Sequence, residues 1–325
     1  MRVCLMIEGQ EGVTWDDWVR LAGLVENHGL EGLFRSDHYT AIVRQHAGAL
    51  DAWATLAGLA AITDRIRLGT LVSPATFRHP SVLARMAVTV DHISGGRVDV
   101  GIGAGWYERE HAEHGFPFLD AKQRFELFAE QVEIVVTSWT EDAFDHSGPR
   151  FELRGQTALP RPVQQPHPPV VLGGTVKPRF AALAARFADE VNTLGAPNDE
   201  LRERKERLDR ACRDAGRDPV TLGFSVMTAC FLGSSRAEVL DRVGSFLAVR
   251  GGDADAAQVL EKRRDTWLAG TVEEVAEKIA KLEALGVTRV FLQHLNHADD
   301  EMIALVGERL LPQIAPQRQG TPCPQ

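Results

Sequence analysis

The sequence predicts a single α/β domain over residues 1–315, built as a (β/α)8 TIM barrel. Short apolar runs, long enough for buried strands and too short for helices, alternate with amphipathic helical segments along the chain. Strands that alternate with helices in this way pair in parallel through crossover connections. A doubly wound open sheet uses the same units, but eight units in one continuous run within 325 residues favour closure into a barrel.

The first strand–helix unit shows how the elements are assigned. Residues 3–7 (VCLMI) form an apolar run of strand length. Thr14 is placed to cap the helix that follows, and Gly29 is placed to end it. The same signals predict seven further strands, over residues 31–35, 65–72, 97–103, 169–174, 189–194, 221–232 and 289–295. They also predict the later helices, over residues 50–62, 80–92, 121–139, 178–187, 198–215, 236–248, 272–285 and 299–312.

Two stretches interrupt the alternation, and a third lies beyond it. Residues 140–168, after the fourth helix, are rich in turn-forming residues and predict an excursion that contains a small hairpin. Residues 249–268, before the eighth strand, are polar and predict a second excursion. Residues 316–325 are expected to form a flexible C-terminal tail.

Composition argues against several classes of partner. The net charge of −9, from 45 acidic and 36 basic residues, disfavours nucleic acid and anionic membranes, because binding them requires a basic face. No apolar run approaches the ~18 residues that span a bilayer, and the first residues lack the pattern of a signal peptide. We therefore expect a cytoplasmic protein. The cysteines at positions 4, 212, 230 and 323 form no CxxC pair and predict neither a zinc site nor a disulfide framework.

Polar or glycine-rich segments follow almost every predicted strand. In a barrel of this kind, catalytic groups lie at the carboxyl ends of the strands. The segments found at those ends are Glu8-Gly9-Gln10, Ser36-Asp37-His38, Gly103-Ala104-Gly105-Trp106, Gly173-Gly174-Thr175, Asn192-Thr193 and Gln293-His294. The sequence therefore predicts a pocket at this rim.

Each segment has a functional and a purely structural interpretation. His38 is a candidate acid or base because imidazole titrates near neutrality, whereas Asp37 is alternatively a local cap. The "GIGAG" glycines are either a tight turn or a flat surface against which a planar ring lies. The "GGT" turn, followed by a helix that opens at Pro178, is either a simple connection or an anion site to which Lys177 adds charge.

A charged segment, "EREHAEHG", follows the fourth strand. His111 and His114 are three residues apart and are flanked by Glu110 and Glu113. Such residues could share a helix face as metal ligands, but the spacing is not HExxH and no third ligand is specified. We therefore predict a solvated, charged helix and no metal site.

Taken together, these segments resemble the luciferase-like monooxygenase superfamily of flavin- and deazaflavin-dependent barrel enzymes. The matching stretches are "GLEGLFRSDHY", "RIRLGTLVSPATFRHPSVLARMAVTVDHISGGRVDVGIGAGW", "PPVVLGGT" and "WLAGTVEEVAEKIAKLEALGVTRVFLQ". Within the superfamily, Glu8-Gly9-Gln10 combined with Ser36-Asp37-His38 is more similar to the branch that uses coenzyme F420.

The resemblance implies roles for individual residues. Asp37 and His38 would lie beside the redox ring, with His38 as the acid/base and Asp37 orienting it or bonding the ring edge. Leu71 and Val72 match a bulge, often with a non-proline cis peptide, behind the ring. The other residues implied to bind the cofactor are Ser73, Thr76, Gly103, Ala104, Gly105, Trp106, Gly173, Gly174 and Thr175. Trp106 departs from the sugar-phosphate dehydrogenases of this branch, which carry glutamate there.

The function expected from the resemblance is hydride transfer between F420 and a small organic substrate, in a homodimer such as relatives often form. FMN is the alternative cofactor and would make the enzyme a monooxygenase. A metal-dependent barrel hydrolase is a further alternative, although such sites commonly need HxH on the first strand, where this chain has Glu8-Gly9-Gln10. A barrel that binds a cofactor without catalysing a reaction also remains open.

Overall fold

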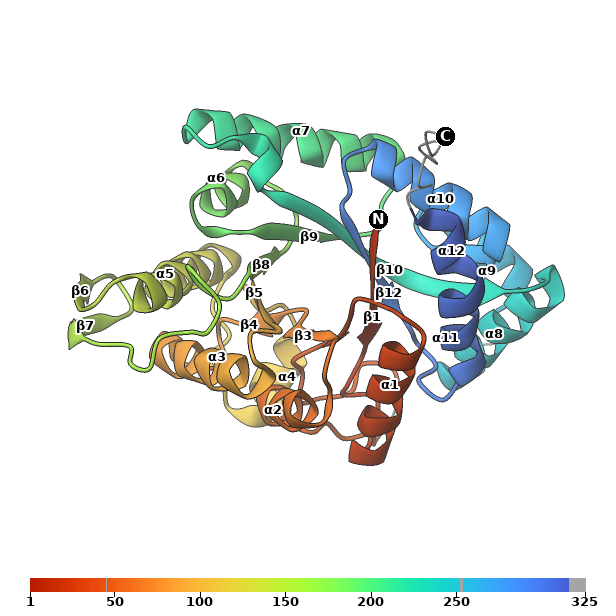
Figure 1. Cartoon of the computed structure of the whole chain (residues 1–325), viewed down its shortest axis with the longest axis horizontal. Coiled ribbons are helices and arrows are strands. Elements are labelled where there is room, and N and C mark those ends of the chain that lie inside the picture. The colour runs from red at the N-terminus through yellow and green to blue at the C-terminus, as the bar shows by residue number, and fades with distance from the viewer. Residues whose placement is uncertain (45, 252–253, 316–325) are drawn as a thin grey trace, which may run out of the picture.

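Eight parallel strands close into a barrel surrounded by helices (Figure 1). The computed structural model describes residues 1–44, 46–251 and 254–315. The barrel strands are β1 (Arg2–Ile7), β2 (Gly32–Arg35), β3 (Arg67–Thr70), β5 (Val98–Gly103), β8 (Val170–Gly173), β9 (Glu190–Leu194), β10 (Gly223–Gly233) and β12 (Arg289–Gln293). They pair in that order, and the pairing of β12 with β1 closes the ring. The predicted TIM barrel is thus confirmed.

The outer helices agree closely with those expected. They are α1 (Trp15–Asn27), α2 (Ala52–Ile62), α3 (Pro80–Ser94), α5 (Ala121–Thr140), α6 (Pro178–Phe187), α7 (Asn198–Asp214), α8 (Arg236–Val249) and α10 (Val272–Ala284). Thr14 caps α1 with both bonds of a capping box, and Gly29 follows its last turn at φ +76°. No helix among the described residues is long and apolar enough to cross a membrane.

The last predicted helix is divided. It consists of α11 (Asp300–Leu305), a π-helical turn (Val306–Leu310) and α12 (Leu311–Ile314). Pro312 has no amide hydrogen, so the regular bonding pattern cannot continue through it. The predicted tail, residues 316–325, lies outside the described residues.

Both excursions carry secondary structure. The first contains the expected hairpin, β6 (Phe144–Ser147) and β7 (Glu152–Gln156), which projects away from the barrel (Figure 1). The second contains α9 (Ala256–Arg263) and ends where β11 (Leu268–Thr271) begins, two elements that the polar composition did not predict. They form because β11 pairs with the carboxyl end of β10 and because α9 packs on α8 around a small apolar core.

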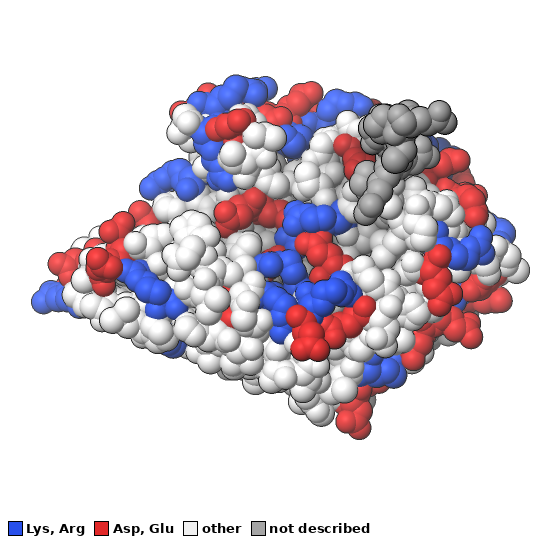
Figure 2. Space-filling view, viewed as in Figure 1, with Lys and Arg blue, Asp and Glu red and all other residues white. Residues whose placement is uncertain are grey.

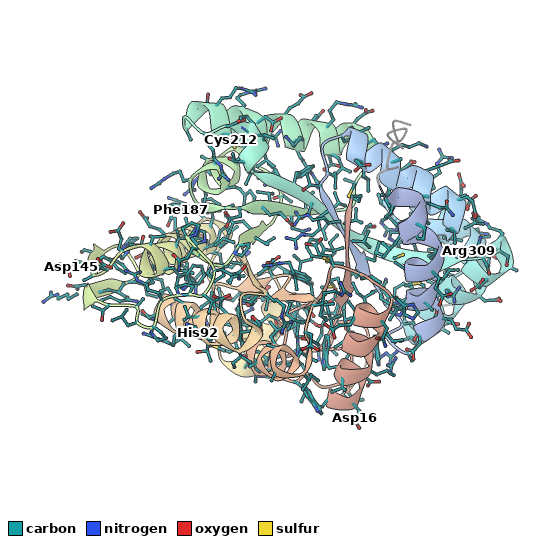
Figure 3. The ribbon with its side chains drawn as sticks, in the orientation of Figure 1. Asp16, His92, Asp145, Phe187, Cys212 and Arg309 are labelled. Carbon is teal, nitrogen blue, oxygen red and sulfur yellow. The ribbon has the colours of Figure 1, made fainter. Side chains whose placement is uncertain are left out.

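The strands are buried on both faces, as in other barrels with an outer layer of helices. Along β1, Val3, Leu5 and Ile7 pack in the large core shared with the helices, whereas Cys4 and Met6 belong to a separate cluster. That second cluster contains Phe34 and Phe291, whose rings meet edge to face at 4.9 Å. Side chains fill both regions, so the barrel is a packed core (Figure 3).

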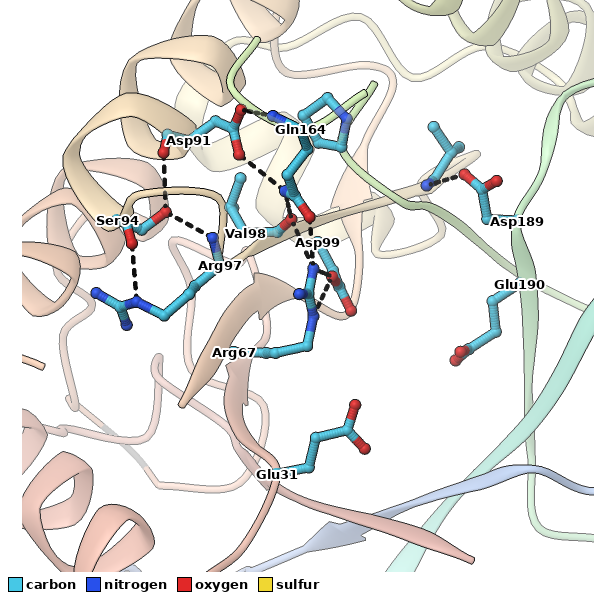
Figure 4. Close-up of polar contacts among 12 residues, drawn as sticks. Glu31, Arg67, Asp91, Ser94, Arg97, Val98, Asp99, Gln164, Asp189 and Glu190 are labelled. Atoms are coloured by element: carbon cyan, nitrogen blue, oxygen red, sulfur yellow. Dashed lines mark hydrogen bonds and ion pairs between the residues drawn. The ribbon is translucent and has the colours of Figure 1, made fainter. Parts of the chain in front are cut away.

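A buried ionic layer lies on the amino-terminal side of these rings. Arg289 donates to Asp99 (2.7 Å) and Glu190 (2.6 Å), and its guanidinium lies over Phe291, 5.0 Å from the ring centre. Arg67 also donates to Asp99 (Figure 4). Burial opposes ionisation of Asp99, but the charges of Arg289 and Arg67 outweigh it and keep the pKa of that carboxyl below its ordinary value.

The ionic layer also anchors the first excursion. Gln164 accepts from Arg67 (3.1 Å) and donates to the carbonyl of Val98 (2.8 Å) and to Asp91 (2.8 Å), as Figure 4 shows. On the surface, by contrast, acidic and basic side chains are interspersed over the face seen in Figure 2.

Arg289→Met should therefore lower the free energy of unfolding by about 3–5 kcal/mol, because Asp99 and Glu190 remain buried without their main cation. Urea unfolding monitored by circular dichroism measures this loss. Arg309→Met is the matched control, since Arg309 pairs with Glu273 on the surface and should cost less than about 1 kcal/mol. Equal losses in the two variants would contradict a special role for the ionic layer.

Candidate active site

A cavity of about 620 Å³ opens at the carboxyl ends of the barrel strands. Its floor is apolar, because Met6, Leu71, Val72 and Met227 reach it from the cluster inside the barrel. Predicted site residues that line it are His38, Leu71, Val72, Gly105, Trp106, Gly173, Gly174 and Thr175. The volume lies within the usual range of small-molecule sites.

His38 is held by Glu110, a residue that the sequence did not single out as its partner. Nδ1 of His38 lies 2.8 Å from Oε2 of Glu110. The other oxygen of Glu110 accepts from the amides of Tyr39 and Thr40. Both side chains are largely buried, with 13 % and 1 % of their surface exposed. One carboxylate thus fixes three consecutive residues after β2.

The electrostatics of this pair favour the charged forms of both groups. Burial lowers the pKa of His38, but the hydrogen bond and charge of Glu110, with smaller contributions from Glu8 and Asp37, outweigh it and raise that pKa above the ordinary value. Burial likewise opposes ionisation of Glu110, and its bonds to His38, Thr40 and Tyr39 lower its pKa overall.

Glu110 lies on α4 (Glu108–His114), and the prediction that this helix is solvated was wrong for its inner face. Glu110 and His111 are buried. His111 Nε2 lies 2.7 Å from the hydroxyl of Thr76, and His114 Nε2 lies 3.3 Å from that of Thr40. Both histidines are therefore engaged with hydroxyl groups. Within residues 1–44, 46–251 and 254–315, no three metal-ligating side chains are grouped to hold an ion.

Asp37 does not line the cavity and is not a hydrogen-bond partner of the His38 ring. Its carboxylate accepts two bonds from Arg78, at 2.6 and 3.1 Å, and one from Ser73, at 2.6 Å. Arg78 reaches Asp51 as well, at 2.9 Å. Because Asp37 is only 1 % exposed and its oxygens are engaged, the expected role of orienting His38 belongs to Glu110. Asp37 instead supports the loop from behind.

Three of the other predicted cofactor residues also lie behind the cavity wall. Ser73 bridges Asp37 and Trp53, whose indole donates to it at 3.0 Å. Thr76 bonds His111. Ala104 is half-buried and does not line the cavity. These side chains support the lining residues, and their contacts with a cofactor stay predictions.

The glycines that end β5 and β8 make room for a protein side chain. The Leu71–Val72 peptide is cis, as the resemblance implied. The strand predicted over residues 65–72 ends as β3 at Thr70, and a short strand, β4 (Ser73–Pro74), follows. A Cβ on Gly103 would lie 2.6 Å from Val72, and one on Gly173 would lie 2.8 Å from it. Val72 occupies the space in front of Gly103 and presents its own surface to the cavity, and contact between a ring and the GIGAG segment stays a prediction.

The turn after β8 faces the cavity, but its surroundings differ from the expected anion site. The amide of Gly174 donates to the carbonyl of Asn192 at 3.1 Å, so it is already paired. Lys177 is exposed and does not line the cavity. A cation at this side is Arg204 on α7, which lines the cavity, donates to the carbonyl of Leu194 at 3.1 Å and pairs with Glu200 on its own helix.

Several further lining residues were not predicted as site residues. Glu8, Gln10 and Gln293 stood out as strand ends, and here Glu8 accepts from the amides of both glutamines. A further group comes from helices and from the second excursion, where no strand-end signal marks its members. They include Arg204, Phe246, Arg250, Arg263 and Trp267.

Comparison with known proteins agrees with this architecture. Residues 2–289 match the luciferase-like monooxygenase family. The chain is 24 % identical to an FMNH2-dependent dimethylsulfone monooxygenase of Pseudomonas putida, over 94 % of this chain and 90 % of that protein. It is 26 % identical to an F420-dependent glucose-6-phosphate dehydrogenase of Microbacterium testaceum, over 90 % and 91 % of the two chains.

Among solved structures, a monooxygenase of Streptomyces bottropensis superposes with a TM-score of 0.84 at 24 % identity, covering 97 % of this chain and all of that one. This similarity establishes the shared fold. With a family match over nearly the whole chain, the conclusion is direct: this protein belongs to the luciferase-like monooxygenase family.

Proposed function

We propose that the protein transfers a hydride between the deazaflavin coenzyme F420 and a small organic substrate. The observation that carries the proposal is that one cavity contains His38, Val72 and the turn at Gly173–Thr175. An acid/base group, an apolar supporting surface and a turn near a cation, here Arg204, are the parts that this chemistry requires.

The cavity fits such a cofactor by shape and by chemistry. The apolar floor of Met6, Leu71, Val72 and Met227 suits one face of a planar ring. Thr175 and Arg204 would hold the phosphate-bearing side chain, since both line the same side of the cavity. When bound, the coenzyme supplies a carbon centre that accepts or donates hydride.

The side chains of this protein would bind, orient and exchange the accompanying proton. Because Nδ1 of His38 faces Glu110, Nε2 is the atom that can exchange a proton with the substrate. Glu110 stabilises the imidazolium and fixes the ring orientation. Trp106, which meets the His38 ring edge to face at 5.9 Å, would shield that proton from bulk water.

FMN is the second candidate cofactor, and the similarity to the dimethylsulfone monooxygenase favours it. The similarity to the F420-dependent dehydrogenase favours the deazaflavin, as do the residues at the ends of the first two strands. A reduced flavin activates oxygen and a deazaflavin does not, so the cofactor decides between a monooxygenase and a dehydrogenase or reductase.

Equilibrium titration of the purified protein with F420 and with FMN, side by side, tests the proposal. We expect F420 to bind at least ~10-fold more tightly, which corresponds to about 1.4 kcal/mol. Tighter binding of FMN, together with oxygen consumption, would indicate that the protein is a monooxygenase. Failure of both to bind would remove the proposed function.

His38→Ala should lower turnover by ~10²–10⁴, the usual contribution of a general acid or base. The dissociation constant of the cofactor should change little, because the ring contacts come from other residues. His92→Ala is the control, since His92 lies on the outer helix α3 and bonds the carbonyl of Arg161. Unchanged turnover in His38→Ala would exclude the proton-exchange role.

Glu110→Gln should lower the pKa of His38, because burial then acts without the main opposing charge. Titration of the His38 ring by NMR measures the midpoint, which should exceed 6.5 in the unmodified protein. Glu113→Gln, on the same helix but bonded to Arg109 and Thr40, should leave it unchanged. An unaltered midpoint in Glu110→Gln would refute the coupling.

The same pair has a consequence for stability. The folded-state pKa of His38 is raised above its ordinary value near 6.5. The His38–Glu110 pair therefore makes its full contribution to the free energy of unfolding below that pH, and the contribution is lost as pH rises through the folded-state pKa.

A further inference from the structure

The polar groups that line the cavity are mostly paired with one another. Ser36 donates to Gln10 at 2.5 Å, and Gln10 donates to Glu8 at 2.9 Å. Asn192 donates to Ser225 at 3.0 Å. Glu11 accepts from the amides of residues 42–44, at 2.7–3.0 Å. These groups therefore have little capacity left for the hydroxyl groups of a ligand.

Two arginines in the same cavity differ from these paired polar groups. Arg250 and Arg263 line it and are exposed. Neither forms an ion pair with an acidic side chain in the described ranges 1–44, 46–251 and 254–315, whereas the neighbouring Arg264 pairs with Glu261. Arg250 lies over Phe246 at 5.4 Å, and Arg263 lies over the ring of Trp267 at 5.9 Å. Stacking of this kind holds a guanidinium in place and leaves its hydrogen-bond donors available.

The cavity wall beside these arginines is apolar. Phe246 and Trp267 both pack against Phe231, at 5.5 and 5.1 Å between ring centres, and both line the cavity. At the mouth, three large apolar side chains that line it remain exposed: Ile42 (40 %), Trp106 (61 %) and Leu194 (63 %). Exposed apolar groups that converge on one cavity indicate an apolar ligand.

The arginines are separate from the turn assigned above to the cofactor phosphate. That turn follows β8, whereas Arg250 follows α8, after β10, two strands further round the barrel. Glu8 and Glu11 line the cavity with carboxylates that accept only neutral donors. Their charge disfavours an anion beside them, and so directs an anionic group toward the arginines.

We propose that the substrate is an apolar, ring-containing molecule that bears a carboxylate or a similar acidic group. Phe246 and Trp267 would pack against its apolar part, while Arg250 and Arg263 bind its acidic group. This inference rests on the proposed function of the cavity, and it specifies the substrate class that the function leaves open. A polyhydroxylated sugar phosphate fits poorly, because the lining offers few unpaired partners for its hydroxyl groups.

The test compares two ligands of the same shape, 2-naphthoate and naphthalene-2-carboxamide, by isothermal titration calorimetry at low ionic strength. We expect the unmodified protein to bind the carboxylate ~10-fold more tightly, the scale of one hydrogen bond to a charged group. Arg250→Gln and Arg263→Gln should each reduce that preference, and Phe246→Ala should weaken both ligands. High salt should diminish the preference as well.

Arg264→Gln is the matched control. Arg264 adjoins Arg263 in sequence, is similarly exposed and pairs with Glu261, but it does not line this cavity. Equal binding of the two ligands, no binding of 2-naphthoate, or an equal loss in Arg264→Gln would overturn the proposal.

A second measurement separates the substrate from the cofactor. The dissociation constants of F420 and FMN should change less than ~3-fold in Arg250→Gln and Arg263→Gln, because these arginines are assigned to the substrate. A tenfold change would correspond to about 1.4 kcal/mol. A tenfold weakening of either cofactor would show that the arginines bind the cofactor and would overturn the proposal. If neither cofactor binds the unmodified protein, the proposed function fails, and the comparison of the two naphthalenes still decides whether the acidic subsite exists.

Discussion

The active site depends on one buried carboxylate. Glu110 accepts from the imidazole of His38 and from the amides of Tyr39 and Thr40, and it thereby joins the segment after β2 to the helix after β5. A carboxylate with so little exposure persists as an anion only where its oxygens are bonded. The same bonds fix which nitrogen of His38 faces the cavity. Removing Glu110 would therefore alter position, tautomer and charge together.

A steric constraint forms the floor of the site. Val72 projects between Gly103 and Gly173, and a side chain at either glycine would collide with it. Behind Val72, Gly101 also tolerates no side chain, because a Cβ there would lie 1.9 Å from the carbonyl of Thr70. Glycine is needed at these positions so that the protein segments fit together. Val72, which the glycines accommodate, then forms part of the apolar floor of the cavity.

The two ends of the barrel use charged groups in opposite ways. At the amino-terminal end, Arg289 is enclosed and its charge is matched by Asp99 and Glu190, so this layer stabilises the barrel and has no capacity for a ligand. At the carboxyl end, Arg250 and Arg263 are stacked on aromatic rings without such partners among the described residues. The aromatic rings of Phe34 and Phe291 separate the paired charges at the amino-terminal end from the arginines at the carboxyl end. The two ends can therefore serve stability and ligand binding independently.

The sequence by itself determined the barrel, because strand and helix periodicity and capping residues such as Thr14 act over a few residues. Chemistry at strand ends is local in a barrel, so the sequence also pointed to His38 and the turn at Gly173–Thr175, while the family resemblance implied Val72; all of them line the cavity. Tertiary structure alone decided that Glu110 pairs with His38, that Asp37 turns toward Arg78, and that Arg250 and Arg263 reach the cavity. These outcomes depend on contacts between segments far apart in the chain, for which local patterns carry no information.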